Sequence, residues 1–182
     1  MKRKIYKWIF FRLMGWSIVG TIDKNIKKCV MIVVPHTSWN DFFIGLFARG
    51  IIGLEIHWVG KKELFRFPVS YYFRWMGGEP LDRSGGRNNV DSIVAIFQRR
   101  ETFRMAIAPE GTRKKVTEWK TGFYYIAIKA GIPIIPVAFD YGKKEVNIGT
   151  PFYPTAHNEE DFKALEKHFI GVRGKFAQNS FL

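Results

Sequence analysis

Short apolar runs alternate with helical segments along most of this chain, and that alternation restricts its possible folds more than any other feature. Runs rich in valine and isoleucine, typical of buried strands, lie at residues 29–34, 54–59, 103–108 and 134–139, with a brief extended segment at 79–82. Helices are predicted at residues 41–49, 69–75, 90–100, 122–130 and from Asn158 onward. We therefore predict an α/β domain in which a mixed, mostly parallel sheet is flanked by helices.

The size and cysteine content favour one domain without covalent cross-links. A chain of 182 residues can be built around a single core, and neither repeats nor low-complexity segments interrupt it. Cys29 is the only cysteine, which excludes an internal disulfide and a cysteine-based zinc site. The four histidines lack the spacing of a helical zinc pair, so we predict no metal site.

The charge and aromatic content indicate an anionic partner. The 29 Lys and Arg residues exceed the 16 acidic ones, for a net charge of +13, which favours phosphate esters, anionic lipid or nucleic acid. Aromatic residues make up 16% of the chain, with six Trp and 17 Phe. This composition favours a membrane interface over a simple polyanion binder.

The N-terminal segment 1–28 allows two interpretations. Residues 5–22 are apolar and aromatic, but Lys7 and Arg12 interrupt them and no small-residue cleavage site follows, so a signal peptide or a transmembrane span fits poorly. A helix lying in the lipid interface fits better, with cationic side chains reaching the head groups. An ordinary helix packed on the core is the alternative, because Arg12 falls away from the lysines on a helical wheel. We predict an N-terminal membrane-interfacial helix, 1–28, on the cytoplasmic face of a membrane, followed by the main domain, 29–182.

A histidine and an aspartate follow the first apolar run, where α/β folds commonly place ligand-binding groups. His36 and Asp41 are five positions apart, so on a continuous helix they would point about 140° away from each other at about 100° per residue. They can meet if residues 37–40 turn the chain. A histidine held by a carboxylate can then take a proton from an alcohol. A buried histidine with a purely structural hydrogen bond remains the alternative.

Cationic residues recur after the other predicted strands. They are Lys61 and Lys62 after the strand ending near Val59, Arg83 after the segment 79–82, and Arg113 after the strand 103–108. Guanidinium groups bind phosphate oxygens in bidentate fashion and lysines add a point charge. Gly111 in the same turn allows close backbone approach, and its N–H is a candidate oxyanion donor. Taken singly, each of these cationic residues is also compatible with an ordinary solvent-exposed surface position.

Four blocks in this order resemble the glycerolipid acyltransferases, the family of 1-acylglycerol-3-phosphate acyltransferase. The segment from His36 to Asp41, His-Thr-Ser-Trp-Asn-Asp, resembles the HxxxxD motif of that family. The further blocks are Gly-Lys-Lys-Glu-Leu at 60–64 with Pro68 and Asp82-Arg83, then Pro-Glu-Gly-Thr-Arg at 109–113, and Ile-Pro-Ile-Ile-Pro-Val at 132–137. The resemblance covers residues 36–137.

The resemblance implies roles for these residues. His36 and Asp41 would carry catalysis, and the acceptor phosphate site would consist of Lys61 or Lys62 with Arg83, Glu110 and Arg113. Pro133 and Pro136 would help to shape an acyl pocket. The family implies an acyl-CoA or acyl-carrier-protein donor as co-substrate, with no other cofactor, and a lysophospholipid acceptor at the membrane surface. The expected product is phosphatidic acid made from lysophosphatidic acid.

Two rival hypotheses stay open. The same chemistry suits another lysophospholipid, or an amine acceptor in lipid synthesis. The charge alone also permits a basic membrane- or nucleic-acid-binding module without enzymatic activity. No recognisable nucleic-acid-binding motif is present, and that hypothesis leaves the four ordered blocks unexplained, so we expect no nucleic-acid partner.

Overall fold

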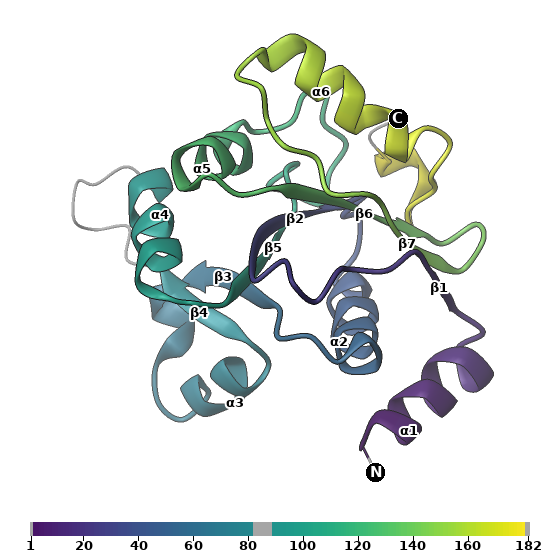
Figure 1. Cartoon of the computed structure of the whole chain (residues 1–182). Helices are drawn as coiled ribbons and strands as arrows, with labels where there is room; N and C mark the ends of the chain where they lie inside the picture. The colour runs from purple at the N-terminus through teal and green to yellow at the C-terminus, as the bar shows by residue number, and fades with distance from the viewer. Residues whose placement is uncertain (1, 82–88, 181–182) are drawn as a thin grey trace.

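The central element is one mostly parallel sheet. The structure, a computed structural model, describes residues 2–81 and 89–180. Within them seven strands form a sheet in the order β1-β7-β6-β2-β5-β3-β4 (Figure 1). Only the β6–β7 pair is antiparallel among the described neighbours. The strands are β1 Ser17–Val19, β2 Lys28–Val34, β3 His57–Lys61, β4 Gly78–Leu81, β5 Phe103–Ile107, β6 Ile134–Asp140 and β7 Glu145–Ile148. The predicted mixed, mostly parallel sheet is confirmed.

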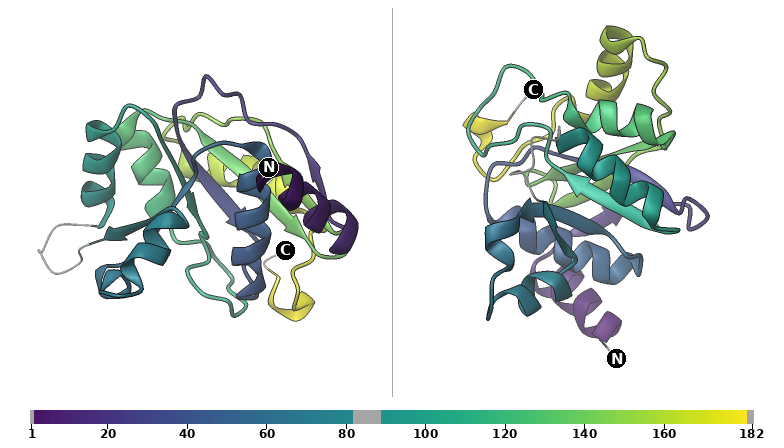
Figure 2. Two further views of the ribbon diagram at one scale, coloured as in Figure 1. Left: turned by 90° about the horizontal axis from the view of Figure 1, so that it is seen from below. Right: turned by 90° about the vertical axis from the view of Figure 1, so that its left-hand side faces the viewer.

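Helices cover both faces of this sheet. α1, α2 and α3 lie toward one face, and α4, α5 and α6 lie toward the other (Figures 1 and 2). Their bounds are α1 Lys2–Lys7, continued by a π-helical stretch Trp8–Leu13, then α2 Asn40–Ile52, α3 Ser70–Trp75, α4 Asn89–Arg99, α5 Gly122–Ala130 and α6 Asn158–Glu166. Short 3₁₀ turns occur at Lys62–Phe65, Lys167–Phe169 and Ala177–Asn179. Helices α2 to α6 therefore occur where the sequence predicts helices, whereas the helical part of the segment 1–28 ends at Leu13.

The two faces of the sheet bury separate apolar clusters. Successive side chains of a strand point to opposite faces, so a strand buried on both sides is apolar throughout. In β2, Val30 and Ile32 pack into the cluster under α4 and α5, whereas Cys29 and Met31 pack into the cluster under α2. This double burial explains why the run at 29–34 has no polar alternation.

Two short strands were not predicted from the sequence. β1 pairs in parallel with β7, and β7 pairs with β6. β1 has only three residues, and β7 alternates half-buried and buried side chains over four. Such short segments carry too little periodicity to separate them from loops. As a result, part of the segment 1–28 belongs to the sheet.

The N-terminal helix ends at Leu13 and packs against α2. The rings of Tyr6 and Phe47 meet edge to face at 5.5 Å, and Arg3 Nε donates to the carbonyl oxygen of Ile51 at 2.7 Å. Phe10 is fully buried beneath this contact. Within residues 2–81 and 89–180, no helix combines the length and apolar character needed to cross a bilayer.

Candidate functional site

The site lies in a crevice at the carboxyl ends of β2 and β5. These two strands are parallel neighbours, and the helices that follow them, α2 and α5, lie on opposite faces of the sheet (Figure 1). The loops after the two strands therefore diverge, which leaves a crevice where α/β proteins bind ligands. His36 stands in the loop after β2, and Glu110 stands in the loop after β5.

His36 and Asp41 meet as the sequence predicts. The distance between His36 Nδ1 and Asp41 Oδ2 is 3.0 Å. Residues 37–39 turn the chain, so that Asp41 lies in the first turn of α2 and faces back toward the histidine. With Nδ1–H donating to the carboxylate, Nε2 keeps its lone pair and can accept a proton. The imidazole is 26% exposed whereas the Asp41 side chain is 2% exposed, so an incoming molecule reaches the histidine and not the aspartate.

The Asp41 carboxylate also holds its own loop in place. Its Oδ2 atom accepts hydrogen bonds from the backbone N–H groups of Thr37 at 3.0 Å and Ser38 at 2.9 Å. Its Oδ1 atom accepts from the Tyr141 hydroxyl at 2.7 Å. Burial and the neighbouring carboxylate raise the pKa of Tyr141, so the phenol stays protonated and remains a donor. Asp41 is thus a buried charge whose oxygens are occupied by donors.

Glu110 supports the histidine from beneath. Its Oε2 atom accepts a hydrogen bond from the backbone N–H of His36 at 2.6 Å, and its Oε1 atom is buried and has no hydrogen-bond partner among the residues that the structure describes. Burial raises the pKa of this carboxyl to about 7, although the His36 N–H acts in the opposite direction. Its expected place in a phosphate site stays a prediction. The side chain is enclosed and faces the backbone of His36, where it positions the histidine loop.

The turn that follows Glu110 presents cations and Gly111. Gly111 adopts a φ of +64°, a conformation that favours glycine, and its N–H donates to the carbonyl of Ala108 at 3.2 Å. That N–H is thus engaged within its own turn, and its assignment to an oxyanion stays a prediction. Arg113 is exposed in this turn. The Lys120 amine, which the sequence analysis missed, lies so close that a Cβ atom on Gly111 would sit 2.7 Å from it.

Two of the remaining predicted cations, Lys61 and Lys62, lie at the same edge of the sheet. Lys61 ends β3, and Lys62 is exposed in the turn that follows it. Because β3 is parallel to β5, these residues stand at the edge that carries the His36 loop. Arg83 lies outside the described residues. In the described part of the chain, no three His, Cys, Asp or Glu side chains gather in a group that could hold a metal ion.

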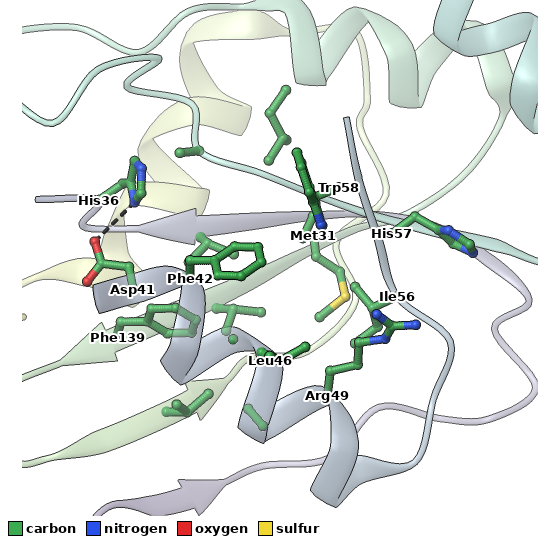
Figure 3. A pocket seen from close by; sticks show the side chains of 18 of the residues that line it. Met31, His36, Asp41, Phe42, Leu46, Arg49, Ile56, His57, Trp58 and Phe139 are labelled. Atoms are coloured by element: carbon green, nitrogen blue, oxygen red, sulfur yellow. Dashed lines mark hydrogen bonds and ion pairs between the residues drawn. The ribbon is translucent and has the colours of Figure 1, made fainter. Parts of the chain in front are cut away.

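An apolar cavity opens beside the His36–Asp41 pair. Its volume is about 290 Å³, and it runs between α2 and the sheet. His36 and Asp41 stand at one end, with His57 and Arg49 at the other (Figure 3). Most of its wall is apolar, including Met31, Val33, Phe42, Gly45, Leu46, Ile52, Trp58, Met76, Val137 and Phe139. This shape suits a long, flexible apolar chain whose reactive end lies near His36.

The two prolines expected at an acyl pocket lie outside this cavity. Neither Pro133 nor Pro136 lines the cavity. Alternation along β6 directs Val137 and Phe139 to the cavity face, whereas Pro136 packs on the other face, close to Gly149. Pro133 precedes β6, and its carbonyl accepts from the N–H of Val30 at 3.0 Å. Both prolines thus lie outside the wall of this cavity, and their role in shaping an acyl pocket stays a prediction.

The C-terminal segment braces both loops of the site, which the sequence analysis did not foresee. The backbone N–H of Phe176 donates to Thr37 Oγ1 at 3.3 Å, and Gly174 packs so closely that a Cβ atom there would lie 2.6 Å from Thr37. The Asn179 amide donates to the carbonyl of Arg113 at 3.2 Å. One segment thereby links the loop after β2 with the loop after β5.

Comparisons with known proteins agree with this geometry. A family model described as Acyltransferase matches residues 18–140. The 1-acyl-sn-glycerol-3-phosphate acyltransferase of Salmonella typhimurium is 35% identical over 96 residues, which cover 50% of this chain and 39% of that protein. The protein of the same name from Haemophilus influenzae is 33% identical over 153 residues, covering 79% of this chain and 63% of its own. The matched part is thus about two fifths of the Salmonella protein.

A solved structure shows the same fold. The crystal structure of the 1-acyl-sn-glycerophosphate (LPA) acyltransferase PlsC from Thermotoga maritima superimposes with a TM-score of 0.60, covering 91% of this chain and 74% of that one. The two sequences are 22% identical, so the similarity shows the fold alone. It agrees with the arrangement of sheet and helices described above.

Proposed function

The chain belongs to the acyltransferase family, because the family model matches residues 18–140, and on that premise we propose that it transfers a fatty acyl group from an acyl thioester to the free hydroxyl of lysophosphatidic acid. The product is phosphatidic acid. The donor is acyl-CoA or acyl-carrier protein. The observation that carries this proposal is the His36–Asp41 pair, at a distance of 3.0 Å, at the mouth of an apolar cavity.

The proposed chemistry is a direct transfer with His36 as the base. Nε2 of His36 takes the proton of the acceptor hydroxyl while that oxygen attacks the thioester carbon. Asp41 keeps the ring oriented and stabilises the positive charge that forms on it. The tetrahedral intermediate then collapses, the carbon–sulfur bond breaks, and the imidazolium returns the proton to the departing thiolate. The ester and the free thiol balance the reaction, and no covalent enzyme intermediate is required.

The cations at the crevice suit the acceptor phosphate. Arg113 is exposed, Lys62 follows a neighbouring parallel strand, and Lys120 lies against Gly111. An arginine fork and two ammonium groups can hold a phosphate and so fix the position of the hydroxyl relative to His36. Arg83 is proposed as a further phosphate-binding cation on the basis of its position in the sequence, before α4.

The acyl chain is proposed to occupy the apolar cavity, and Gly45 offers a test. A Cβ atom on Gly45 would lie 3.6 Å from Phe139 Cζ, inside the cavity wall. We expect Gly45→Leu to block the deeper part and to lower kcat/KM for long-chain donors by about tenfold relative to short-chain donors, as overpacking costs about 1–3 kcal/mol. The measurement is a series of rates with donors of increasing chain length.

A second helical glycine provides the matched control for that change. Gly122 begins α5, and a Cβ atom there meets nothing within 4 Å. Gly122→Leu should leave the chain-length profile unchanged. An unchanged profile in Gly45→Leu as well would place the acyl chain outside this cavity.

Tyr141 is predicted to be a positioning residue that acts through Asp41. Its hydroxyl donates to Asp41 Oδ1 at 2.7 Å, and hydrogen bonds to charged groups contribute about 1.5–3 kcal/mol. We expect Tyr141→Phe to lower kcat by about tenfold with little change in the acceptor KM, because the substrate contacts remain. Steady-state kinetics with varied acceptor concentration separates the two constants.

A second buried tyrosine serves as the control for Tyr141→Phe. The Tyr124 hydroxyl donates to Asp161 Oδ2 at 2.6 Å on the opposite face of the sheet. Tyr124→Phe removes a comparable bond, so it should lower stability while kcat per folded molecule stays at the wild-type value. If both variants lost kcat equally, the effect would be a general loss of rigidity.

The experiment that tests the proposed function is acyl transfer from labelled oleoyl-CoA to lysophosphatidic acid in detergent micelles. Labelled phosphatidic acid is the expected product. A panel of acceptors with and without phosphate, and with an amine in place of the hydroxyl, identifies the acceptor class. Comparing acyl-CoA with acyl-carrier protein as the donor shows which thioester the protein uses. Absence of transfer with every donor and acceptor, together with salt-sensitive binding of oligonucleotides, would replace the proposal with the non-enzymatic module.

We further propose that the protein works at the cytoplasmic side of a membrane. The acceptor is an amphiphile that resides in a bilayer, and the thioester donors are water-soluble. The N-terminal helix supports this location, since Trp8 and Leu13 are exposed on it and lysines lie beside them.

A further inference from the structure

An exposed apolar patch lies on α3 and the turn before it, at a distance in sequence from the N-terminal helix. Phe67 is 91% exposed and Tyr71 is 86% exposed. The patch, called the α3 patch below, consists of Phe67, Val69, Tyr71, Tyr72 and Trp75. Scattered exposed aromatic residues are normal on a soluble protein, but contiguous apolar patches usually mark interaction sites.

Only one side of the α3 helix packs against the rest of the described protein. None of its residues is buried. Phe73 makes the inward contacts, with ring centroids 5.9 Å from Trp58 and 6.0 Å from Phe65. Tyr71 and Trp75 are four positions apart, so they project together from one side of the helix. That side has no covering element in the described part of the chain.

The charges around the α3 patch complement an anionic surface. Arg66 and Arg74 are exposed beside it, and no acidic residue occurs between Glu63 and Glu79. Aromatic residues interleaved with arginines, without carboxylates, are typical of segments that lie in the head-group region of a bilayer. Two copies of the patch facing each other would bring the arginines together, which disfavours a homodimer through this face.

The α3 patch and the N-terminal helix stand beside the same hollow. Trp75 lines that hollow together with Lys2 and Tyr6 of α1. Both elements lie on the α2 side of the sheet (Figures 1 and 2). The first 22 residues contain no acidic residue. Two segments far apart in the sequence therefore present aromatic and cationic side chains next to one another.

Ring contacts connect the α3 patch with the apolar cavity. Tyr72 of the patch contacts Phe73 at a ring-centroid distance of 6.0 Å, Phe73 contacts Trp58, and Trp58 contacts Phe42 with ring centroids 5.8 Å apart. Trp58 and Phe42 both line the cavity that ends at His36. A series of aromatic ring contacts thus links the patch to the wall of the cavity.

We propose that the α3 patch is a second membrane-docking surface, which binds an anionic bilayer next to the N-terminal helix. The inference deepens the proposed function, because an enzyme whose acceptor is a membrane lipid needs its cavity held against the bilayer. The binding itself requires neither donor nor acceptor, so it can be measured apart from catalysis.

Vesicle flotation without substrate tests the proposal. The probes are vesicles of phosphatidylcholine alone and vesicles of equal parts phosphatidylcholine and phosphatidylglycerol. The double variant Tyr71→Ser with Trp75→Ser should bind the anionic vesicles about tenfold more weakly than wild type, given the apolar area removed from the interface. Arg66→Gln should weaken binding to the anionic vesicles about fivefold and leave binding to the neutral ones unchanged.

The control removes exposed apolar side chains elsewhere. Tyr153 is 63% exposed and Ile170 is 71% exposed, both outside the α3 patch. Tyr153→Ser with Ile170→Ser should bind vesicles as wild type does. The proposal is overturned if the α3 variant keeps wild-type affinity, or if the control loses as much. A wild-type dimer that dissociates in the α3 variant, or oligonucleotide binding lost in that variant with vesicle binding intact, would assign the patch to another partner.

Acyl transfer measured in detergent micelles distinguishes a failure of the docking proposal from a failure of the proposed function. If the α3 variant binds vesicles weakly but retains transfer in micelles, the docking role stands and catalysis is intact. If wild type binds vesicles through the patch but transfers no acyl group, the docking role stands while the proposed function fails.

Discussion

Replacing His36 with alanine is expected to lower kcat by about 10²- to 10⁴-fold, the usual contribution of a general base. The imidazole is the exposed member of the pair, and its Nδ1 atom lies 3.0 Å from Asp41 Oδ2, which leaves Nε2 to face the acceptor hydroxyl. Nothing else described in the crevice combines this exposure with an orienting carboxylate. The measurement is labelled phosphatidic acid formed from oleoyl-CoA and lysophosphatidic acid, compared with wild type.

The alanine variant should remain folded, because the lost side chain is partly exposed. Circular dichroism and thermal unfolding verify this. A matched change at His168, whose Nε2 lies 3.2 Å from the carbonyl of Asn147 on another part of the sheet, should retain full kcat. Product formed at the wild-type rate by His36→Ala would remove this histidine from the role of base.

Changing Asp41 to asparagine is expected to lower kcat by about 10³-fold while the acceptor KM changes little. The carboxylate orients the histidine and accepts from Thr37 N–H, Ser38 N–H and the Tyr141 hydroxyl. An amide keeps one acceptor oxygen but presents an NH₂ group to donors on its other side, so it loses both the charge and part of this network. Single-turnover kinetics would show the loss in the chemical step.

Asp161 is the appropriate control for a buried aspartate with several donors. Its carboxylate accepts from the Tyr124 hydroxyl, the Thr155 N–H and the Thr155 hydroxyl, on the side of the sheet away from the catalytic pair. Asp161→Asn should reduce stability, since these donors lose a charged acceptor, without reducing kcat per folded molecule. If Asp41→Asn kept full kcat in intact protein, the orienting role of Asp41 would be wrong.

Most of the fold followed from local patterns. The apolar runs at 29–34 and 134–139 correspond to β2 and β6, and the helical spacing at 122–130 corresponds to α5. These elements are long and buried, so their side-chain periods are strong. β1 and β7 were missed because their pairing with each other and with β6, rather than their own composition, makes them strands.

The meeting of His36 and Asp41 was predictable because it is local. His36 and Asp41 belong to one loop, and a single turn between a strand and a helix brings them together. The supporting residues were not predictable in this way. Tyr141 reaches Asp41 across 100 positions, and Glu110 reaches the His36 N–H across 74. No spacing rule connects such distant residues.

The sequence by itself determined the alternating elements and the meeting of His36 with Asp41 in the loop after β2, since these depend on neighbouring residues along the chain. Only the tertiary structure decided which loops share the crevice and which side chains face it. That outcome depends on the strand order and on the face that each residue occupies. It placed Glu110 against the backbone N–H of His36, engaged the Gly111 N–H in its own turn, and turned Pro136 away from the cavity. The physical reason is that strand order minimises exposed apolar surface over both faces of the sheet at once, a condition that no local segment contains.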